Sequence, residues 1–170
     1  MWNPEFCGDI DIRIGRDGTW YYMNSPIGRP ALVKLFAGIL RRDGGDYFLV
    51  TPVEKLGITV DDAPFTAVEF EVEGKGERQV LRFRTNVGDV VEAGPDHPIR
   101  VNIDPRTGEP APYLMVRDRL EALITRAVFY DLVALGVERT PGNRTILGVF
   151  SGGSFFTIGE LEPDVSERQE

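Results

Sequence analysis

The sequence predicts an α+β protein made of two similar halves that pack against each other. Three observations indicate this fold class: several segments alternate apolar and polar residues with the period of a strand, two segments carry apolar residues at helical spacing, and the order of hairpin, helix and strand occurs twice. We expect an N-terminal half at residues 1–64, a C-terminal half at residues 65–161 and a flexible acidic tail at residues 162–170. A chain of 170 residues buries about two-thirds of its unfolded surface, which is sufficient for a core.

The first half should open with a β-hairpin. Isoleucines alternate with charged residues over 9–14, the turn Arg16-Asp17-Gly18 follows, and β-branched and aromatic residues over 19–23 form the returning strand. Neighbouring residues of a strand face opposite ways, so the aromatic run 20–22 cannot point into the core as a whole. We expect one face of this strand to pack on the helix that follows.

That helix is predicted from Pro30 to Arg42. Proline suits the first turn of a helix because an N–H group there has no intrahelical partner, and the segment places its apolar residues on one broad face. Its two final arginines would lie in the last turn, and Gly44 or Gly45 would end the helix. A short central strand at 47–51 and a connector through 61–64 complete the first half.

The second half should open with a hairpin whose strands, at 68–73 and 81–84, flank the turn at 74–76. Glutamates of the first strand would lie opposite Arg82 and Arg84 of the second. Cross-strand pairs of opposite charge are common on exposed sheet faces, so this pairing explains both arginines without a ligand.

Further strands and one more helix are predicted beyond this hairpin. Asp118 followed three residues later by Glu121 fits a capping box, which predicts the longest helix of the chain from there to Leu135. The prolines and glycine of 104–112 indicate a loop. The other segments with strand character are 90–101, 113–116, 145–150 and 154–160.

A faint internal repeat links the two halves. The first contains Pro26-Ile27-Gly28-Arg29 and the second contains Pro98-Ile99-Arg100, in each case between a hairpin and a predicted helix. Two similar halves that pack together leave a groove between them, and such grooves are frequent ligand sites. The repeat therefore predicts a cleft at the junction.

Composition excludes several classes of protein. The net charge is −8 and no basic run is longer than Arg41-Arg42, so the clustered positive charge that binds duplex nucleic acid is missing. Cys7 is the only cysteine, which rules out an internal disulfide and a cysteine-based zinc site. With no leader pattern and no stretch of about 18 apolar residues, we expect a cytoplasmic protein without a membrane partner.

Common catalytic motifs are also missing, so we expect a protein that is not an enzyme. The chain has no P-loop, no nucleophile elbow and no H-E-x-x-H, and it has one histidine, His97, in a turn beside Asp96. A surface turn is the commoner role for such a histidine, although a hydrolase would need it as a base. The neighbours Asp61 and Asp62 fit a turn better than a metal site, so we assign no metal ligand, and the sequence identifies no cofactor.

Seven polar or aromatic residues lie at the seams between predicted elements. Aromatic rings can stack on a planar ligand, arginines can bind phosphate or carboxylate, and amide or carboxylate groups can bind ring edges. Core packing of the aromatic residues and a buried ion pair between Glu54 and an arginine are the structural alternatives. The candidate ligand-binding residues are Trp20, Tyr22, Arg29, Glu54, Asn86, Arg117 and Arg126.

Several motifs resemble a bacterial family of unknown function, DUF1285, over nearly the whole chain. They are R-D-G-T-W-Y-Y, S-P-I-G-R, L-V-K-L-F-A-G-I-L, L-V-T-P-V-E-K, F-R-T-N and V-R-D-R-L-E-A-L-I-T-R. The resemblance implies a duplicated α+β fold with a second half similar to pleckstrin-homology domains, a site for a nucleotide-like ligand at the junction and a role in signal transduction. The chain departs from the expected pattern at Met23-Asn24, where we expect glycine.

Three functional hypotheses follow. The first is a binding or sensor module that holds a small anion, with a nucleotide as one candidate, between the halves. The second is a protein-interaction module that docks a partner on an exposed strand edge or aromatic face. The third is a hydrolase that uses His97 with an acidic partner.

Overall fold

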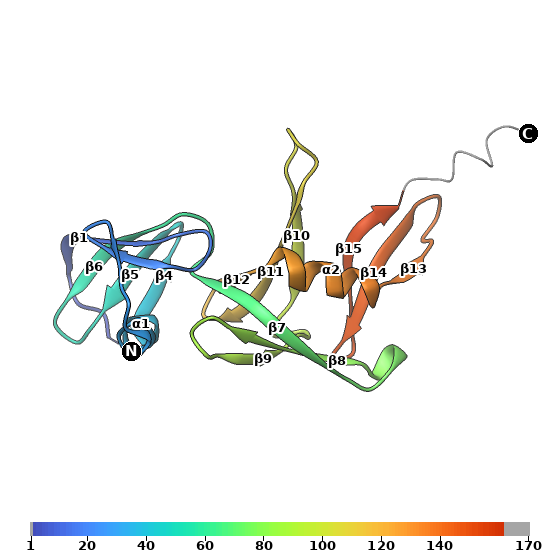
Figure 1. Cartoon of the computed structure of the whole chain (residues 1–170), viewed down its shortest axis with the longest axis horizontal. Coiled ribbons are helices and arrows are strands. Elements are labelled where there is room, and N and C mark those ends of the chain that lie inside the picture. Colours follow the sequence, from blue (N-terminus) through green and yellow to red (C-terminus); the bar gives the residue numbers. More distant parts are fainter. Residues whose placement is uncertain (1, 162–170) are drawn as a thin grey trace, which may run out of the picture.

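The protein, described by a computed structural model over residues 2–161, is built mainly from β-sheet (Figure 1). The predicted tail at 162–170 lies outside the described residues. In the first half, six strands form one sheet in the order β3-β2-β1-β6-β5-β4. The elements are β1 (Phe6–Ile14), β2 (Trp20–Tyr22), β3 (Ser25–Pro26), α1 (Pro30–Gly38), β4 (Leu40–Asp43), β5 (Asp46–Val50) and β6 (Lys55–Val60).

The second half contains a six-stranded sheet and a smaller three-stranded sheet at the far end of the molecule (Figure 1). The larger sheet has the order β10-β11-β12-β7-β8-β9, and the smaller one has the order β13-β14-β15. The elements are β7 (Phe65–Glu73), the 3-10 helix η1 (Gly76–Arg78), β8 (Val80–Thr85), β9 (Val90–Glu92), β10 (Ile99–Ile103), β11 (Pro110–Arg117), β12 (Leu120–Ile124), α2 (Arg126–Ala134), β13 (Val137–Arg139), β14 (Thr145–Ser151) and β15 (Ser154–Leu161).

The two large sheets have the same strand order. Each consists of two three-stranded meanders, and the first strand of the first meander pairs in parallel with the last strand of the second, β1 with β6 and β7 with β12. Buried residues of both halves, among them Trp20 and Leu81, belong to one continuous core. The predicted α+β architecture of two similar, packed halves is therefore confirmed. The helices differ in position, because α1 lies between the meanders and α2 follows both.

The predicted helix from Pro30 to Arg42 is too long. It ends at Gly38, and the chain then forms the edge strand β4, so Arg41 and Arg42 lie in a hairpin with β5 instead of a last helical turn. Gly44, with φ 63°, makes the turn of that hairpin. Leu40 pairs with Leu49 of β5, and this explains the difference. The stabilisation from pairing with a neighbouring strand exceeds the weak helical preference of the segment.

The capping box predicted at Asp118 is wrong. Asp118 and Arg119 have φ values of 47° and 65° and form the two-residue turn between β11 and β12, with Arg117 opposite Leu120. Positive φ at both positions is the geometry of the hairpin turn that matches strand twist. The helix starts after Thr125, and the segment expected to begin it is strand β12.

Three strands, β3, β6 and β13, lie in segments for which no element was predicted. The connector expected after residue 51 and through residue 64 contains β6, which joins the two meanders of the first sheet, and β13 follows the second helix. Met23 and Asn24, where glycine was expected, adopt φ values of 46° and 67° in the turn that leads to the short strand β3. Asparagine tolerates this left-handed region better than most residues do.

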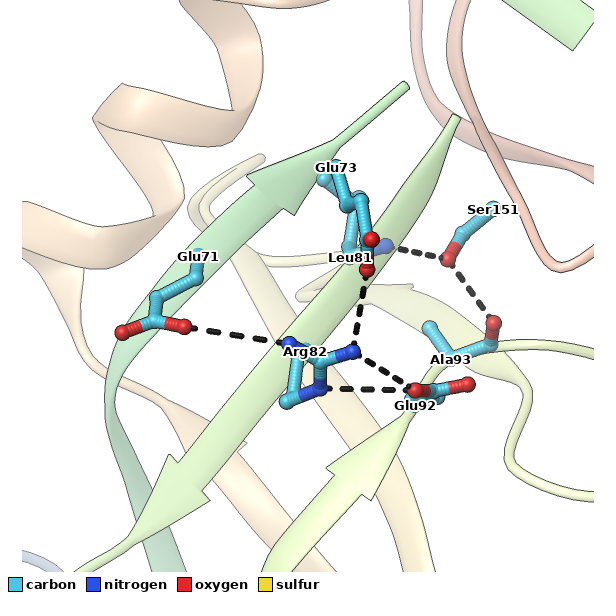
Figure 2. A network of polar contacts seen from close by, with 7 residues as sticks. All are labelled: Glu71, Glu73, Leu81, Arg82, Glu92, Ala93 and Ser151. Atoms are coloured by element: carbon cyan, nitrogen blue, oxygen red, sulfur yellow. Dashed lines mark hydrogen bonds and ion pairs between the residues drawn. The ribbon is translucent and has the colours of Figure 1, made fainter. Parts of the chain in front are cut away.

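The hairpin of β7 and β8 has the predicted charge pairing. Glu69 lies opposite Arg84 and Glu71 opposite Arg82. Figure 2 shows Arg82 between three carboxylates, with Nη2 to Glu73 Oε2 at 3.1 Å and to Glu92 Oε1 at 2.9 Å. The hydrogen bonds to Glu92 and Glu73 raise the pKa of Arg82, and they link β8 to its two neighbours, β9 and β7.

Candidate functional site

A pocket of about 420 Å³ lies at the junction of the two halves. Three segments far apart in the sequence form it: the β1–β2 turn with the start of β2, the β3–α1 connection with the first turns of α1, and the β8–β9 turn. Its volume falls in the usual range for small-molecule sites. The lining residues are Gly18, Thr19, Trp20, Ile27, Gly28, Pro30, Ala31, Val33, Lys34, Asn86 and Val87.

Trp20 supplies the aromatic wall of this pocket. Its side chain is 1% exposed and stacks on Phe36 of α1, with ring centroids 6.2 Å apart. The indole Nε1 is buried and has no hydrogen-bond partner among the described residues. A buried N–H group without an acceptor costs about 1–3 kcal/mol.

The positive end of α1 and one lysine give the pocket its charge. Arg29 is the N-cap residue, its side chain caps no helical amide, and the first turn contains no acidic residue. Lys34 is the one charged residue among those that line the pocket in the described chain. Helix N-termini and ammonium groups both favour anions. Lys34 and this helix end are therefore the positive groups of a pocket whose other lining residues are uncharged.

Asn86 shapes the pocket from the second half. Its Oδ1 accepts a hydrogen bond from the Thr66 amide at 3.0 Å, and its Nδ2 donates to the Gly18 carbonyl at 3.2 Å. The side chain thus connects β7 and the β8–β9 turn to the β1–β2 turn. Trp20 and Asn86 are the two predicted site residues that the structure brings to one pocket.

Arg117 lies at another part of the junction. It ends β11, and it does not precede the second helix as expected. Its Nη2 donates to the Ala37 carbonyl at the end of α1 at 2.8 Å, its Nε lies 3.6 Å from Asp89 Oδ2, and its guanidinium lies 5.3 Å from the Phe65 ring centroid. These contacts tie the second half to the C-terminal end of α1.

Three predicted site residues of the first half are exposed. Tyr22 ends β2 and is 49% exposed, and Arg29 lies beside the pocket lining at Gly28 and Pro30. Glu54 lies between β5 and β6, where its amide and carbonyl bond to Thr51. No ion pair of Glu54 occurs among the described residues, so the buried pair with an arginine is not found.

Arg126 lines a second, wider groove of about 1100 Å³. It is the first residue of α2, and aromatic residues of α2 and β11 share the groove with prolines of the β10–β11 hairpin. The acidic residues Asp61, Asp62, Asp104 and Glu109 outnumber the two arginines, Arg16 and Arg126.

Asp62 anchors Tyr113 on the floor of this groove. The Tyr113 hydroxyl donates to Asp62 Oδ1 at 2.6 Å, and Arg16 Nε lies 3.3 Å from Asp62 Oδ2. Burial, and then the hydrogen bond to Asp62, raises the pKa of Tyr113 to about 12. The phenol therefore remains a neutral donor at ordinary pH.

His97 and the aspartates have structural partners. The Nδ1 of His97 lies 3.0 Å from the Met115 carbonyl, so the contact of this ring nitrogen is a backbone oxygen and not the acidic partner of the hydrolase hypothesis. Asp61 pairs with Arg13, and no group of three or more metal-binding side chains occurs in residues 2–161. Neither helix of this range is long and apolar enough to cross a bilayer.

Sequence reasoning missed Lys34 and the apolar pocket residues Ile27, Val33 and Val87. Lys34 had a signal, because it is the first cation after the proline that begins the helix and lies about one turn further along. Val87 had none, since only the packing of the second half on the first brings it to the pocket.

These features define a two-half α+β protein with a pocket at the junction, and the comparisons assign it to a family. The chain belongs to the DUF1285 family. Residues 1–63 match "Domain of unknown function (DUF1285), N-terminal domain", and residues 64–158 match "Protein of unknown function (DUF1285), C-terminal domain".

Two solved structures are similar to this chain. A DUF1285 family protein from Silicibacter pomeroyi DSS-3 is 54% identical with a TM-score of 0.86, and the alignment covers 99% of this chain and 88% of the other. A second family member, from Shewanella baltica OS155, is 29% identical with a TM-score of 0.58 and coverage of 72% and 90%. No curated protein matches the sequence.

Proposed function

We propose that the protein is a non-enzymatic binding module that holds a small anion in the junction pocket. The observation that carries this proposal is the character of the pocket itself: Lys34 is its one charged lining residue, and the positive end of α1 forms one wall. The indole N–H of Trp20, a residue that lines the pocket, has no acceptor among residues 2–161. Charge and donor both select for an anion.

A ligand in this pocket would contact both halves. Gly18 and Trp20 belong to the first half, whereas Asn86 and Val87 belong to the second. Binding would therefore stabilise the packing of one half on the other, which is the property required of a sensor. A nucleotide is one candidate, with its phosphate at Lys34 and its ring on the apolar wall.

A thermal-shift screen of nucleotides, sugar phosphates and carboxylates tests this proposal. An anion that binds the folded protein, present at a concentration of 100 times its Kd, should stabilise the folded state by about 2.7 kcal/mol and raise Tm. Lys34→Gln should abolish the shift. The control is Lys75→Gln, which removes the same charge from the exposed turn after β7 and should leave the shift intact. Absence of any anion-dependent shift, or an equal shift in Lys34→Gln, would overturn the proposal.

A second proposed function, protein docking, has support from the wide groove. Its volume of about 1100 Å³ exceeds that of an ordinary small-molecule site, and its acidic and aromatic lining suits a basic, extended segment of a partner.

Glu109 has no ion pair among the described residues and is available for a cation. Glu109→Gln should weaken binding of a Lys/Arg-rich peptide in fluorescence anisotropy, whereas Glu77→Gln, in the exposed η1, should not. Equal peptide affinities of the parent protein, Glu109→Gln and Glu77→Gln would exclude this groove as the docking site.

A further inference from the structure

Two arginines from different halves exchange hydrogen bonds across the junction. Arg42, in β4, donates from Nη1 to the Arg119 carbonyl at 3.1 Å, and Arg119, in the β11–β12 turn, donates from Nη2 to the Arg42 carbonyl at 2.8 Å. Arg42 also donates from Nε to the Gly44 carbonyl at 2.9 Å, and its guanidinium carbon lies 5.7 Å from the Tyr47 ring centroid. The two guanidinium groups are therefore anchored on the same two backbone segments.

This pair of cations has no carboxylate partner among residues 2–161. Asp43, next to the first arginine in sequence, pairs with Arg41 and Lys55. Glu121, two residues after the second arginine, accepts two hydrogen bonds from Arg100. Carboxylates close in sequence thus bind other cations, and the repulsion between the two guanidinium groups is not relieved by an ion pair.

Most of the donors of the two side chains are unused by the described part of the chain. A guanidinium group has five N–H donors in a planar fork. Arg42 donates from Nε and Nη1, and Arg119 donates from Nη2 alone. Arg42 is half-buried and Arg119 is exposed, so a dissolved ligand can reach both. Planar arginine forks bind phosphate oxygens through parallel, charge-assisted hydrogen bonds.

We infer that Arg42 and Arg119 form a second anion site, separate from the junction pocket, for a phosphate group with two negative charges. A phosphate monoester carries a charge of about −1.5 to −2 at pH 7, which matches the two guanidinium groups. The backbone contacts hold these groups in place, so binding costs less side-chain entropy. Neither arginine lines the junction pocket, and the site does not depend on the proposed function. A bound phosphate would connect the β4–β5 hairpin of the first half to the β11–β12 turn of the second.

Isothermal titration calorimetry with methyl phosphate tests the inference. Dimethyl phosphate, a diester with one negative charge, is the matched comparison and should bind about 10-fold more weakly, because it loses charge-assisted hydrogen bonds. No binding of methyl phosphate, or equal affinities of both esters, would overturn the inference. A phosphoserine peptide forms a further arm: tighter binding of the peptide than of methyl phosphate identifies a protein as the source of the phosphate, and equal binding identifies a small molecule.

Four variants locate the binding. Arg42→Gln and Arg119→Gln should each weaken methyl phosphate binding about 10-fold. Arg78→Gln, which removes a positive charge from the exposed η1, should bind as the parent does, and so should Lys34→Gln in the junction pocket. An equal loss in Arg78→Gln would show unspecific attraction and overturn the inference. Binding that is lost in Lys34→Gln but kept in Arg42→Gln and Arg119→Gln would place the phosphate in the junction pocket, which overturns this inference and supports the proposed function.

Asp118→Asn provides a test that leaves both arginines in place. Asp118 is exposed, precedes Arg119 and has no ion pair among the described residues. Its φ of 47° suits asparagine, so the substitution removes a negative charge beside the site without straining the turn. Methyl phosphate should bind about 2-fold or more tightly, as expected when an exposed like charge is removed. If an arginine variant does not fold, an affinity of Asp118→Asn equal to or weaker than that of the parent overturns the inference.

Discussion

Asn86 donates from Nδ2 to the carbonyl of Gly18 at 3.2 Å, so a side chain of the second half binds the turn between β1 and β2 of the first. The same amide accepts from the Thr66 amide at 3.0 Å. The bond to Thr66 fixes the side chain within the second half, and the bond to Gly18 joins the two halves at the edge of the junction pocket.

Asn86→Ala should lower the free energy of unfolding by about 2 kcal/mol. The substitution removes two hydrogen bonds, each worth about 1 kcal/mol net, and leaves the buried Thr66 amide without an acceptor. Urea denaturation measures the change. Asn143→Ala, in an exposed turn, should stay within about 0.5 kcal/mol of the parent. Similar stabilities of both variants would show that the junction does not depend on this contact.

Gly18→Ala should be destabilising by about 1–3 kcal/mol. Gly18 has φ +90°, and an added Cβ would lie 2.7 Å from Asn86 Nδ2 and 3.0 Å from Thr66 Oγ1. Gly45→Ala provides the comparison, because that glycine has no positive φ and its Cβ would meet nothing within 4 Å. Thermal denaturation of the two variants should show a lower Tm for Gly18→Ala alone.

Ser151→Ala should lower the free energy of unfolding by about 2–3 kcal/mol. The Leu81 amide and the Ala93 carbonyl would lose their shared hydroxyl in a fully buried position. Chemical denaturation should place this variant well below Ser25→Ala, which alters an exposed residue of β3. A stability of Ser151→Ala equal to that of the parent would mean that these two hydrogen bonds contribute nothing to the free energy of unfolding.

Tyr113 should make the protein sensitive to alkaline pH. Its pKa is raised from 10.0 to about 12 in the folded protein, so the unfolded chain loses the phenol proton first as pH rises. The stability contributed by the neutral phenol is complete below about pH 10 and declines as pH rises from 10 to 12. In Tyr113→Phe this decline should be shallower in a Tm-against-pH profile, whereas parallel profiles would contradict the assigned shift.

The sequence by itself determined the fold class, the family and the local pairing of β7 with β8. Period-two alternation and opposite charges across a turn are local properties, and Glu71 therefore lies opposite Arg82 as predicted. Local patterns also explain why Pro30 begins α1.

The tertiary structure decided the identity of short apolar segments and the composition of the site. Residues 40–42 and 120–124 were predicted to be helical, but pairing with β5 and β11 made strands of them, because hydrogen bonds to a partner strand outweigh weak local propensity. Of the seven predicted site residues, Trp20 and Asn86 share the junction pocket, and Arg126 lies in the other groove. Which side chains meet depends on how the halves pack, a relationship between residues far apart in the chain that no local pattern contains.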